Sequence, residues 1–320
     1  MSDLLKTLKF VQGAVARKDF VPALTHFRIK DNEIVGYNGK MALGGPIDLD
    51  LDVTPKANPL IRAIEACEDI VAMHVTKTGR LGIKSGKFRA YIEMIENAVF
   101  PEIRPEGKVY DMDETFYPAV KALAPFVAED ASRPWATGML FRGSSVFATN
   151  NIVLVEQWVK NPFPVDINIP RATIKEILRI KEAPQQVRIS EQSITFMYEG
   201  GRWLRSQVSS LEWPDLGKVL DQPSHPQSFP KDFFTVVESM RHLTDEFDRM
   251  FFKDGHITTS LTEEQGSAYE MNGLPETGVF KNRQLASLEG VAHKIDFSLY
   301  PKPCIFYGDK LRGAIIGMRE

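Results

Sequence analysis

The chain contains one short pattern three times, at nearly equal spacing, and this repetition limits the folds open to it. In each copy, an aromatic residue and a basic residue precede a polar turn and a run of β-prone residues. The pairs are Phe27-Arg28, Phe141-Arg142 and Phe252-Lys253, so the copies lie 114 and 111 residues apart. This spacing predicts a chain built from three related domains.

Two further patterns recur at the same period. Three hairpin-like segments each place a glycine turn before an arginine-bearing strand, and glycine suits tight turns that need a positive φ. The turns are centred on Gly86, Gly200 and Gly308, and the arginines are Arg89, Arg202, Arg205 and Arg312. Apolar residues at helical spacing predict two helices in each copy, at residues 4–15, 58–67, 115–127, 170–180, 232–243 and 281–291.

A short motif of aromatic, proline, acidic and aliphatic residues ends the first two copies. It reads Phe100-Pro101-Glu102-Ile103 in the first copy and Trp213-Pro214-Asp215-Leu216 in the second. Proline stops a strand and stiffens a connector. We therefore predict an α+β chain with domains at 1–108, 109–222 and 223–320. The alternative is that any α+β protein offers such matches by chance.

The composition is that of an ordinary soluble globular protein, with 43% hydrophobic and 25% charged residues. The formal net charge of −3 does not suggest a basic nucleic-acid-binding domain, although net charge hides its distribution. Cys67 and Cys304 lie far apart and suit a reducing cytosol. The sequence shows no signal peptide and no apolar run of membrane-spanning length. We expect a soluble, cytoplasmic protein.

No familiar catalytic or metal-binding pattern is present. The six histidines are scattered, with no pair at metal-ligand spacing. Gly39-Lys40 lacks the other residues of a phosphate loop, and "RGSSV" at 142–146 fits a hairpin turn better than a nucleophile elbow. We expect no enzyme activity, no metal and no cofactor, although catalytic residues can lie far apart in sequence.

One predicted helix carries a stripe of basic residues. Arg171, Lys175 and Arg179 recur at every fourth position of residues 170–180, which places them along one face. A solvated helix face is the ordinary explanation. Three domains that each contribute such helices would instead form a shared basic surface.

At this level of detail the chain resembles the bacterial-type DNA sliding clamp, the β subunit of the replicative polymerase. The resemblance covers essentially the whole chain and rests on the order of "RPWATGMLF" (133–141), "ATNNIVLV" (148–155), "INIPRATIKEILRI" (167–180), "VRIS" to "WPDLGKVL" (187–220) and "GAIIGMRE" (313–320). The chain is somewhat shorter than a cellular member, which suits a phage-encoded or divergent one.

The resemblance implies a homodimer closed head to tail into a ring, with helices lining the hole and sheets on the rim. Its implied partners are double-stranded DNA bound without sequence preference, a DNA polymerase and a clamp loader. The DNA-binding residues that it implies are Arg17, Lys18 and Trp135, beside our helix candidates Arg171, Lys175 and Arg179. For Trp135 the alternative is packing in the domain core.

A peptide-binding groove and a dimer interface are also implied. The groove would be lined by Thr149, Asn151, Leu154, Leu220, Ile316, Met318 and Arg319, and the interface would join Tyr91 and Ile92 to Met240 and Leu243. Asn151-Ile152-Val153 replaces a Gly-His-Arg-like turn of the family, and Gly317 replaces a usual proline. We therefore keep two alternatives open: a clamp-derived scaffold that binds proteins without encircling DNA, and an undetected α+β enzyme.

Overall fold

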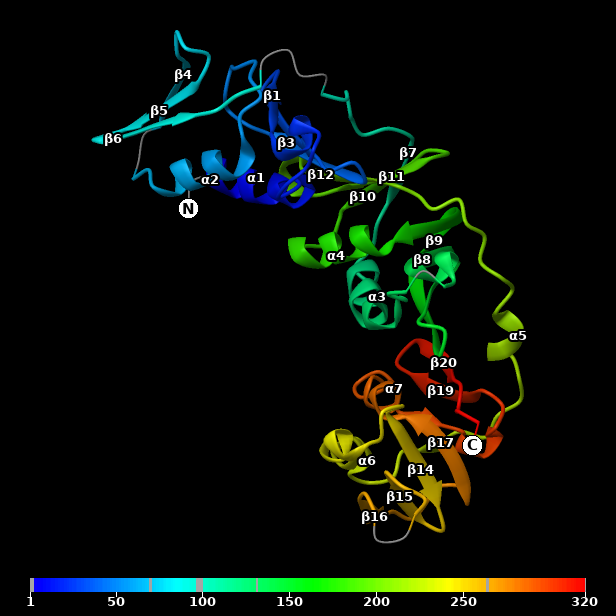
Figure 1. The fold of residues 1–320 in the computed structure, drawn as a ribbon. Coiled ribbons are helices and arrows are strands. Elements are labelled where there is room, and N and C mark those ends of the chain that lie inside the picture. Colours follow the sequence, from blue (N-terminus) through cyan, green and yellow to red (C-terminus); the bar gives the residue numbers. More distant parts are fainter. Residues whose placement is uncertain (1–2, 69–70, 96–99, 131, 263–264, 320) are drawn as a thin grey trace. The chain divides into compact units, whose positions relative to one another are not determined.

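The computed structural model describes residues 3–68, 71–95, 100–130, 132–262 and 265–319. One plan of helix, strands, helix and strands occurs three times along the chain (Figure 1). The first repeat comprises α1 (Asp3–Val11), β1 (Arg28–Lys30), β2 (Glu33–Tyr37), β3 (Met41–Pro46), α2 (Ala57–Glu65), β4 (Ala72–Val75), β5 (Leu81–Ser85) and β6 (Phe88–Ile92).

The other two repeats follow the same order with small changes. The second comprises β7 (Lys108–Asp111), α3 (Phe116–Leu123), β8 (Gly138–Thr149), β9 (Val153–Pro170), α4 (Arg171–Ile180), β10 (Gln186–Ile189), β11 (Ser193–Met197) and β12 (Trp203–Gln207). It ends in the short helix α5 (Gly217–Leu220). The third comprises β13 (Gln227–Ser228), α6 (Phe233–Ser239), β14 (Arg249–Lys253), β15 (His256–Thr258), β16 (Ala268–Glu270), β17 (Thr277–Lys281), α7 (Asn282–Ala286), β18 (Lys294–Ile295), β19 (Cys304–Gly308) and β20 (Leu311–Ile315).

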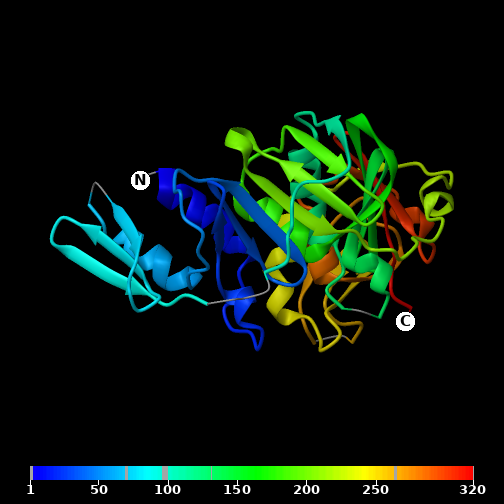
Figure 2. The same ribbon diagram turned by 90° about the horizontal axis from the view of Figure 1, so that it is seen from above.

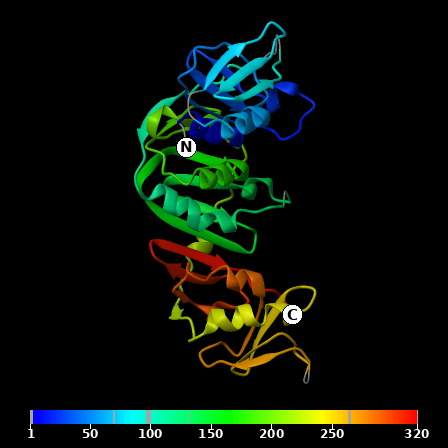
Figure 3. The same ribbon diagram turned by 90° about the vertical axis from the view of Figure 1, so that its left-hand side faces the viewer.

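All six predicted helices are confirmed, and the predicted ends differ by a few residues. The first helix of each repeat is shorter than expected because its last turn narrows to a 3₁₀ turn, at Gln12–Ala14, Ala124–Phe126 and Arg241–Leu243. Each helix buries one apolar stripe, as Leu5, Leu8 and Val11 of α1 show. In the first and third repeats the two helices lie side by side, which Figures 1 and 3 show for α6 and α7.

The repeated aromatic residue is a core position in all three copies. Phe27 and Phe141 are fully buried, and Phe252 is 2% exposed. The hairpin turns follow the prediction at Gly86 (φ 55°) and Gly200 (φ 72°). The third hairpin is also present, between β19 and β20, but Gly308 is not its turn residue. Gly308 belongs to strand β19, and Lys310 takes the positive φ of 51° in that turn. Gly308 is needed for space, because a Cβ there would lie 2.0 Å from the carbonyl oxygen of Val291.

The sheets do not stay within the predicted domains. The seven-stranded sheet has the order β1-β2-β3-β12-β11-β10-β7, and the six-stranded sheet has the order β13-β18-β19-β20-β9-β8. Both are antiparallel, and each joins strands from two successive repeats through β3·β12 or β20·β9. The four-stranded sheet β16-β15-β14-β17 and the three-stranded sheet β4-β5-β6 contain strands from one repeat only.

These shared sheets explain why the chain divides into two compact units rather than three. Unit 1 contains residues 1–114 and 175–208, and unit 2 contains residues 115–174 and 209–320. Each shared sheet lies wholly inside one unit. In unit 1, Figure 2 shows the cyan three-stranded sheet beside α2 and apart from the blue strands. The boundaries near residues 108 and 222 stay predictions of where one repeat ends and the next begins. They do not coincide with the limits of the two compact units.

Candidate DNA-facing helices and peptide groove

In unit 1, Arg179 of α4 holds α4 against α1. Its guanidinium donates to the carbonyl oxygen of Phe10 at 2.7 Å and to the carboxylate of Glu176 at 2.5 Å. The last carbonyls of a helix lack partners within it, so an arginine there satisfies an open acceptor. Glu176 is only 7% exposed, and Gly13 leaves room for it, because a Cβ at Gly13 would overlap its carboxylate.

The other predicted helix cations differ in how free they are. Arg171 forms an ion pair with Glu129, whereas Lys175 is exposed and has no ion-pair partner among the described residues. In α1, Lys9 pairs with Glu65 at 2.7 Å. Arg17 and Lys18 are exposed in the loop after α1. Lys175, Arg17 and Lys18 are thus available to contact phosphates. Arg171 and Arg179 are instead bonded to other residues of the protein.

Trp135 lies in an apolar cluster of unit 2. Its ring meets that of Trp213 edge to face, with 5.0 Å between the centroids. The cluster also holds Leu140, Leu154 and Leu220, together with Ile305 and Ala314. This placement favours core packing over DNA contact.

Two predicted groove residues, Leu154 and Leu220, meet in this same cluster. Leu154 of β9 lies opposite Ala314 of β20, and Leu220 ends α5. Both are buried, at 7% and 1% exposed. They therefore form the floor beneath any groove, not its accessible surface.

The hairpin between β8 and β9 brings the polar groove residues to the edge of this cluster. The Thr149 hydroxyl donates to the carbonyl oxygen of Val153 at 2.8 Å and accepts the N–H of Asn151 at 3.1 Å. Asn151 has a φ of 73°, a conformation that asparagine tolerates well in turns. Asn150 caps the turn by accepting the N–H of Val153 at 2.9 Å. The hairpin end is fixed before any ligand arrives.

The segment after β20 completes the predicted groove. The N–H of Ile316 donates to the carbonyl oxygen of Ile152 at 2.9 Å, and the N–H of Met318 donates to that of Val279 at 2.7 Å. The Tyr300 hydroxyl donates to the Met318 carbonyl oxygen at 2.8 Å. Ile316 is 46% exposed and Arg319 is exposed. Ile316 is therefore the accessible apolar member of the set.

The predicted dimer residues divide into two buried and two exposed positions. Ile92 and Met240 are each 5% exposed and pack inside their own units. Tyr91 on β6 and Leu243 are 57% and 55% exposed. Of these four side chains, only those of Tyr91 and Leu243 can contact another chain without a rearrangement of the fold.

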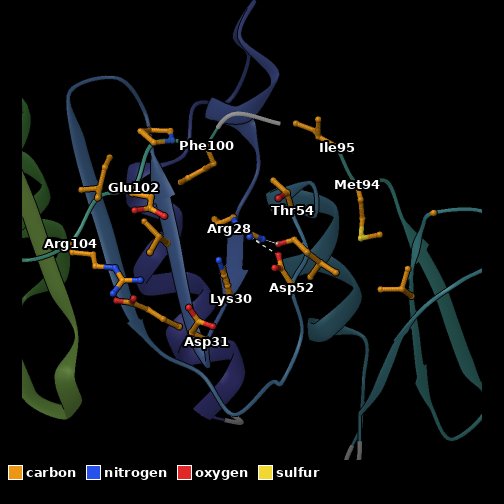
Figure 4. A pocket seen from close by; sticks show the side chains of 17 residues that line it. Arg28, Lys30, Asp31, Asp52, Thr54, Met94, Ile95, Phe100, Glu102 and Arg104 are labelled. Atoms are coloured by element: carbon orange, nitrogen blue, oxygen red, sulfur yellow. Dashed lines mark hydrogen bonds and ion pairs between the residues drawn. The ribbon is translucent and has the colours of Figure 1, made fainter. Parts of the chain in front are cut away.

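A pocket of about 650 Å³ opens beside the Phe100-Pro101-Glu102-Ile103 motif, within unit 1 (Figure 4). Arg28 and Asp52 form an ion pair at 2.5 Å across it. Phe100 and Ile103 pack against the cluster around Trp203. The described lining residues include a single hydroxyl, that of Thr54, and no histidine or cysteine. Among the described lining residues there is therefore no Ser–His or Cys–His pair of the kind that activates a nucleophile.

Other chemistry is equally sparse in the described part of the chain. No group of three or more His, Cys, Asp or Glu residues there could hold a metal ion. Burial raises the pKa of the Cys304 thiol to about 12, so this cysteine is not a reactive thiolate. No helix among these residues has both the length and the apolar character to span a membrane.

Comparisons with known proteins place the fold. No protein-family model and no curated protein matches the chain. Solved structures do: a DnaN sliding clamp (DNA polymerase III subunit beta) from Pseudomonas aeruginosa is 18% identical, with a TM-score of 0.83, over 99% of this chain and 97% of that one. The DNA polymerase III beta chain of Streptococcus pneumoniae (17%, 0.84) and the Bacillus subtilis sliding clamp (17%, 0.83) match over the same shares. The chain has the fold of the bacterial sliding clamp.

Within the clamp fold, the structure also adds residues that the sequence reasoning missed. The sequence predicts Trp213 only as part of a linker motif, but it is a buried member of the apolar cluster that contains Leu154 and Leu220. Its indole N–H is buried with no hydrogen-bond partner among the described residues. The sequence marks Arg312 as a strand arginine but does not predict its ion pair with Glu156, which joins β20 to β9, because the two positions lie far apart in the chain.

Proposed function

We propose that this protein is a sliding clamp: two copies close head to tail around duplex DNA, and the ring tethers a DNA polymerase. The observation that carries the proposal is the match of 99% of the chain to solved sliding clamps at TM-scores of 0.83 to 0.85. The proposed role needs no catalysis. A ring holds DNA by topology, so weak contacts can coexist with long retention.

The sheet joints support ring closure at a specific pair of strands. Within the chain, β3 of the first repeat pairs with β12, the last strand of the second, and β9 of the second repeat pairs with β20, the last strand of the third. In the third repeat, β16 is the third strand after α6, as β3 is the third strand after α1. β16 lies at the edge of its sheet, and so does β6, the last strand of the first repeat. Pairing β16 with β6 of a second copy would join four strands to three, which equals the seven of the complete sheet.

Side chains on these two edges are suited to such a joint. Tyr269 of β16 and Tyr91 of β6 are 49% and 57% exposed. Arg89 is the second residue of β6, as Arg312 is of β20, and both strands follow two-residue turns. Arg312 pairs with Glu156 across the internal joint. By analogy, Arg89 would pair with the exposed Glu270 on β16 of a second copy.

For DNA contact we propose Lys175, Arg17 and Lys18, which are exposed cations without described partners. Cations that meet phosphates bind without reading sequence, and such contacts allow sliding. Arg171 and Arg179 would contribute mainly through helix packing. We do not include Trp135 among the DNA contacts, because it packs on Trp213.

For polymerase tethering we propose the surface around Ile316, above the floor formed by Leu154 and Leu220. Exposed apolar patches rimmed by polar groups commonly bind peptides. Ile316→Asp should weaken binding of a purified replicative DNA polymerase while the protein still forms dimers. Leu261→Asp, at an exposed position elsewhere in the third repeat, serves as the matched control.

The second candidate is a clamp-derived scaffold that binds proteins without encircling DNA. It is favoured by the ion pairs that occupy Arg171, Arg179 and Lys9. Retention on DNA circles decides between the two. A clamp loaded on a nicked circle should stay bound through high-salt washes and leave when the circle is cut. A scaffold would be lost equally from circular and linear DNA.

A further inference from the structure

The loop after α1 presents the most exposed large apolar side chain among the described residues. Phe20 has a relative exposure of 105%, and its neighbour Val21 is 53% exposed. An isolated exposed apolar residue is ordinary, whereas a large exposed apolar patch is informative. Here a whole phenyl ring and a valine stand together in water, beside Arg17 and Lys18.

Hydrogen bonds hold this loop in place. The N–H of Ala16 donates to the carbonyl oxygen of Leu24 at 2.8 Å and closes the loop at its base. At the tip, the Asp19 carboxylate accepts the N–H of Val21 at 2.8 Å. The Thr25 hydroxyl donates to the Pro22 carbonyl oxygen at 2.8 Å. Phe20 is therefore presented by a structured loop, and little ordering cost remains for a ligand to meet.

The charges around the ring favour an anionic ligand. Arg17 and Lys18 are exposed and have no ion-pair partner among the described residues. A third exposed cation, Lys40, follows Gly39, where a Cβ would lie 3.9 Å from the Leu24 side chain at the loop base. The one carboxylate at the tip, that of Asp19, is engaged with Val21.

We propose that Phe20 stacks on an unpaired base of single-stranded DNA, while Arg17 and Lys18 contact the flanking phosphates. An aromatic face beside backbone-tracking cations is the combination that binds single strands. Within a duplex the base faces are stacked on one another, so the grooves offer the ring only base edges. The inference rests on the proposed function, which places Arg17 and Lys18 of this loop against DNA.

The test uses a short single-stranded oligonucleotide carrying one 2-aminopurine, and a blunt duplex of the same sequence. Phe20→Ala should weaken binding of the single strand about tenfold and reduce the stacking-induced quenching of 2-aminopurine. Phe20→Tyr should restore both. Phe20→Leu, which keeps an apolar side chain without a π face, should behave like Phe20→Ala. Val21→Ala is the matched control and should bind like the wild type, and binding of the duplex should not change in any variant.

Three results would overturn the proposal: no binding of the single strand by the wild type, equal losses on single strand and duplex, or tight binding by Phe20→Leu. The last would show that an apolar contact, and not stacking on a π face, accounts for the binding. Short linear oligonucleotides need no ring, so this test is independent of retention on circles. If the protein stacks on the oligonucleotide but is not retained on DNA circles, the clamp is rejected. If it is retained on circles but does not stack, only the stacking proposal is rejected.

Discussion

Arg312 in β20 and Glu156 in β9 lie directly opposite each other across the joint of the six-stranded sheet, with 2.6 Å between Nε and Oε2. Glu156 is 5% exposed and also accepts the Ser145 hydroxyl at 2.6 Å. Arg312 reaches further, to Asp221 at the end of α5, at 2.8 Å. This network connects strands of two repeats with α5, the helix beside the apolar cluster that contains Leu154 and Leu220.

Removing Arg312 should therefore destabilise unit 2 strongly. Arg312→Ala leaves the carboxylate of Glu156 buried without its cation, at an expected cost of about 3 kcal/mol in the free energy of unfolding. Arg312→Met combined with Glu156→Leu should recover most of that loss, since the unpaired charge is gone. Urea unfolding followed by circular dichroism measures both. A loss below about 0.5 kcal/mol for the single variant, the size of a typical surface substitution, would show that the pair is solvated.

Glu106, in the connector that follows the Phe100-Pro101-Glu102-Ile103 motif, makes the stability of unit 1 depend on pH. Hydrogen bonds from the Ser193 hydroxyl and, more weakly, from Ser190, together with the charge of Arg205, hold the pKa of this carboxyl below its ordinary value of 4.5. A carboxyl with a lowered folded-state pKa stabilises the fold above its unfolded pKa, and that contribution is lost as pH falls through the folded pKa.

Glu106→Gln should accordingly lower stability at pH 7 and flatten the decline of stability below about pH 4.5. Thermal unfolding of both proteins over an acidic pH series measures the difference. Glu102→Gln, four residues earlier in the same connector, is the control. Parallel curves for the wild type and Glu106→Gln would contradict the assigned role of the Ser193 and Arg205 contacts.

The proposed ring interface predicts a charge-swap result. Arg89→Glu and Glu270→Arg should each weaken the dimer, by about tenfold or more in Kd, because like charges directly opposite on paired strands repel. Combining the two substitutions should restore dimerisation. Sedimentation velocity over a concentration series measures the dimer fraction. A double variant no better than either single one would place the interface elsewhere.

Two cations on α4 should behave differently toward DNA. Lys175→Ala should reduce the salt dependence of DNA binding, by about 0.9 in the slope of log K against log salt for one lost phosphate contact. Arg179→Ala should leave that slope unchanged and lower stability instead, because Arg179 is bonded to Phe10 and Glu176. Binding titrations from low to moderate salt distinguish them. Equal slopes for Lys175→Ala and the wild type would remove Lys175 from the contact.

Much of the architecture could be predicted from the sequence because it is local. Helical spacing identified α1 to α4, α6 and α7, and the repeated aromatic residue marked a core position in each copy. The joining of strands from neighbouring repeats could not be predicted in this way, since the pairing of β9 with β20 depends on contacts about 160 residues apart, beyond the reach of any local periodicity.

Site residues were harder to predict for a similar reason. The stripe of Arg171, Lys175 and Arg179 is real, but which member is free depends on Glu129 and on the end of α1. Residue type alone also could not separate the buried floor, Leu154 and Leu220, from the accessible Ile316. The positive φ at Lys310 instead of Gly308 shows that a turn and a close packing contact both favour glycine, and the sequence does not say which applies.

The central claim is that two copies of this chain form a closed ring. Electron microscopy of the purified protein in negative stain, with class averages, tests it most directly. The account predicts rings with an open central hole, each built of two chains, and the loss of these rings in Glu270→Arg. Compact single-chain particles without a hole, at concentrations where the dimer should persist, would contradict it.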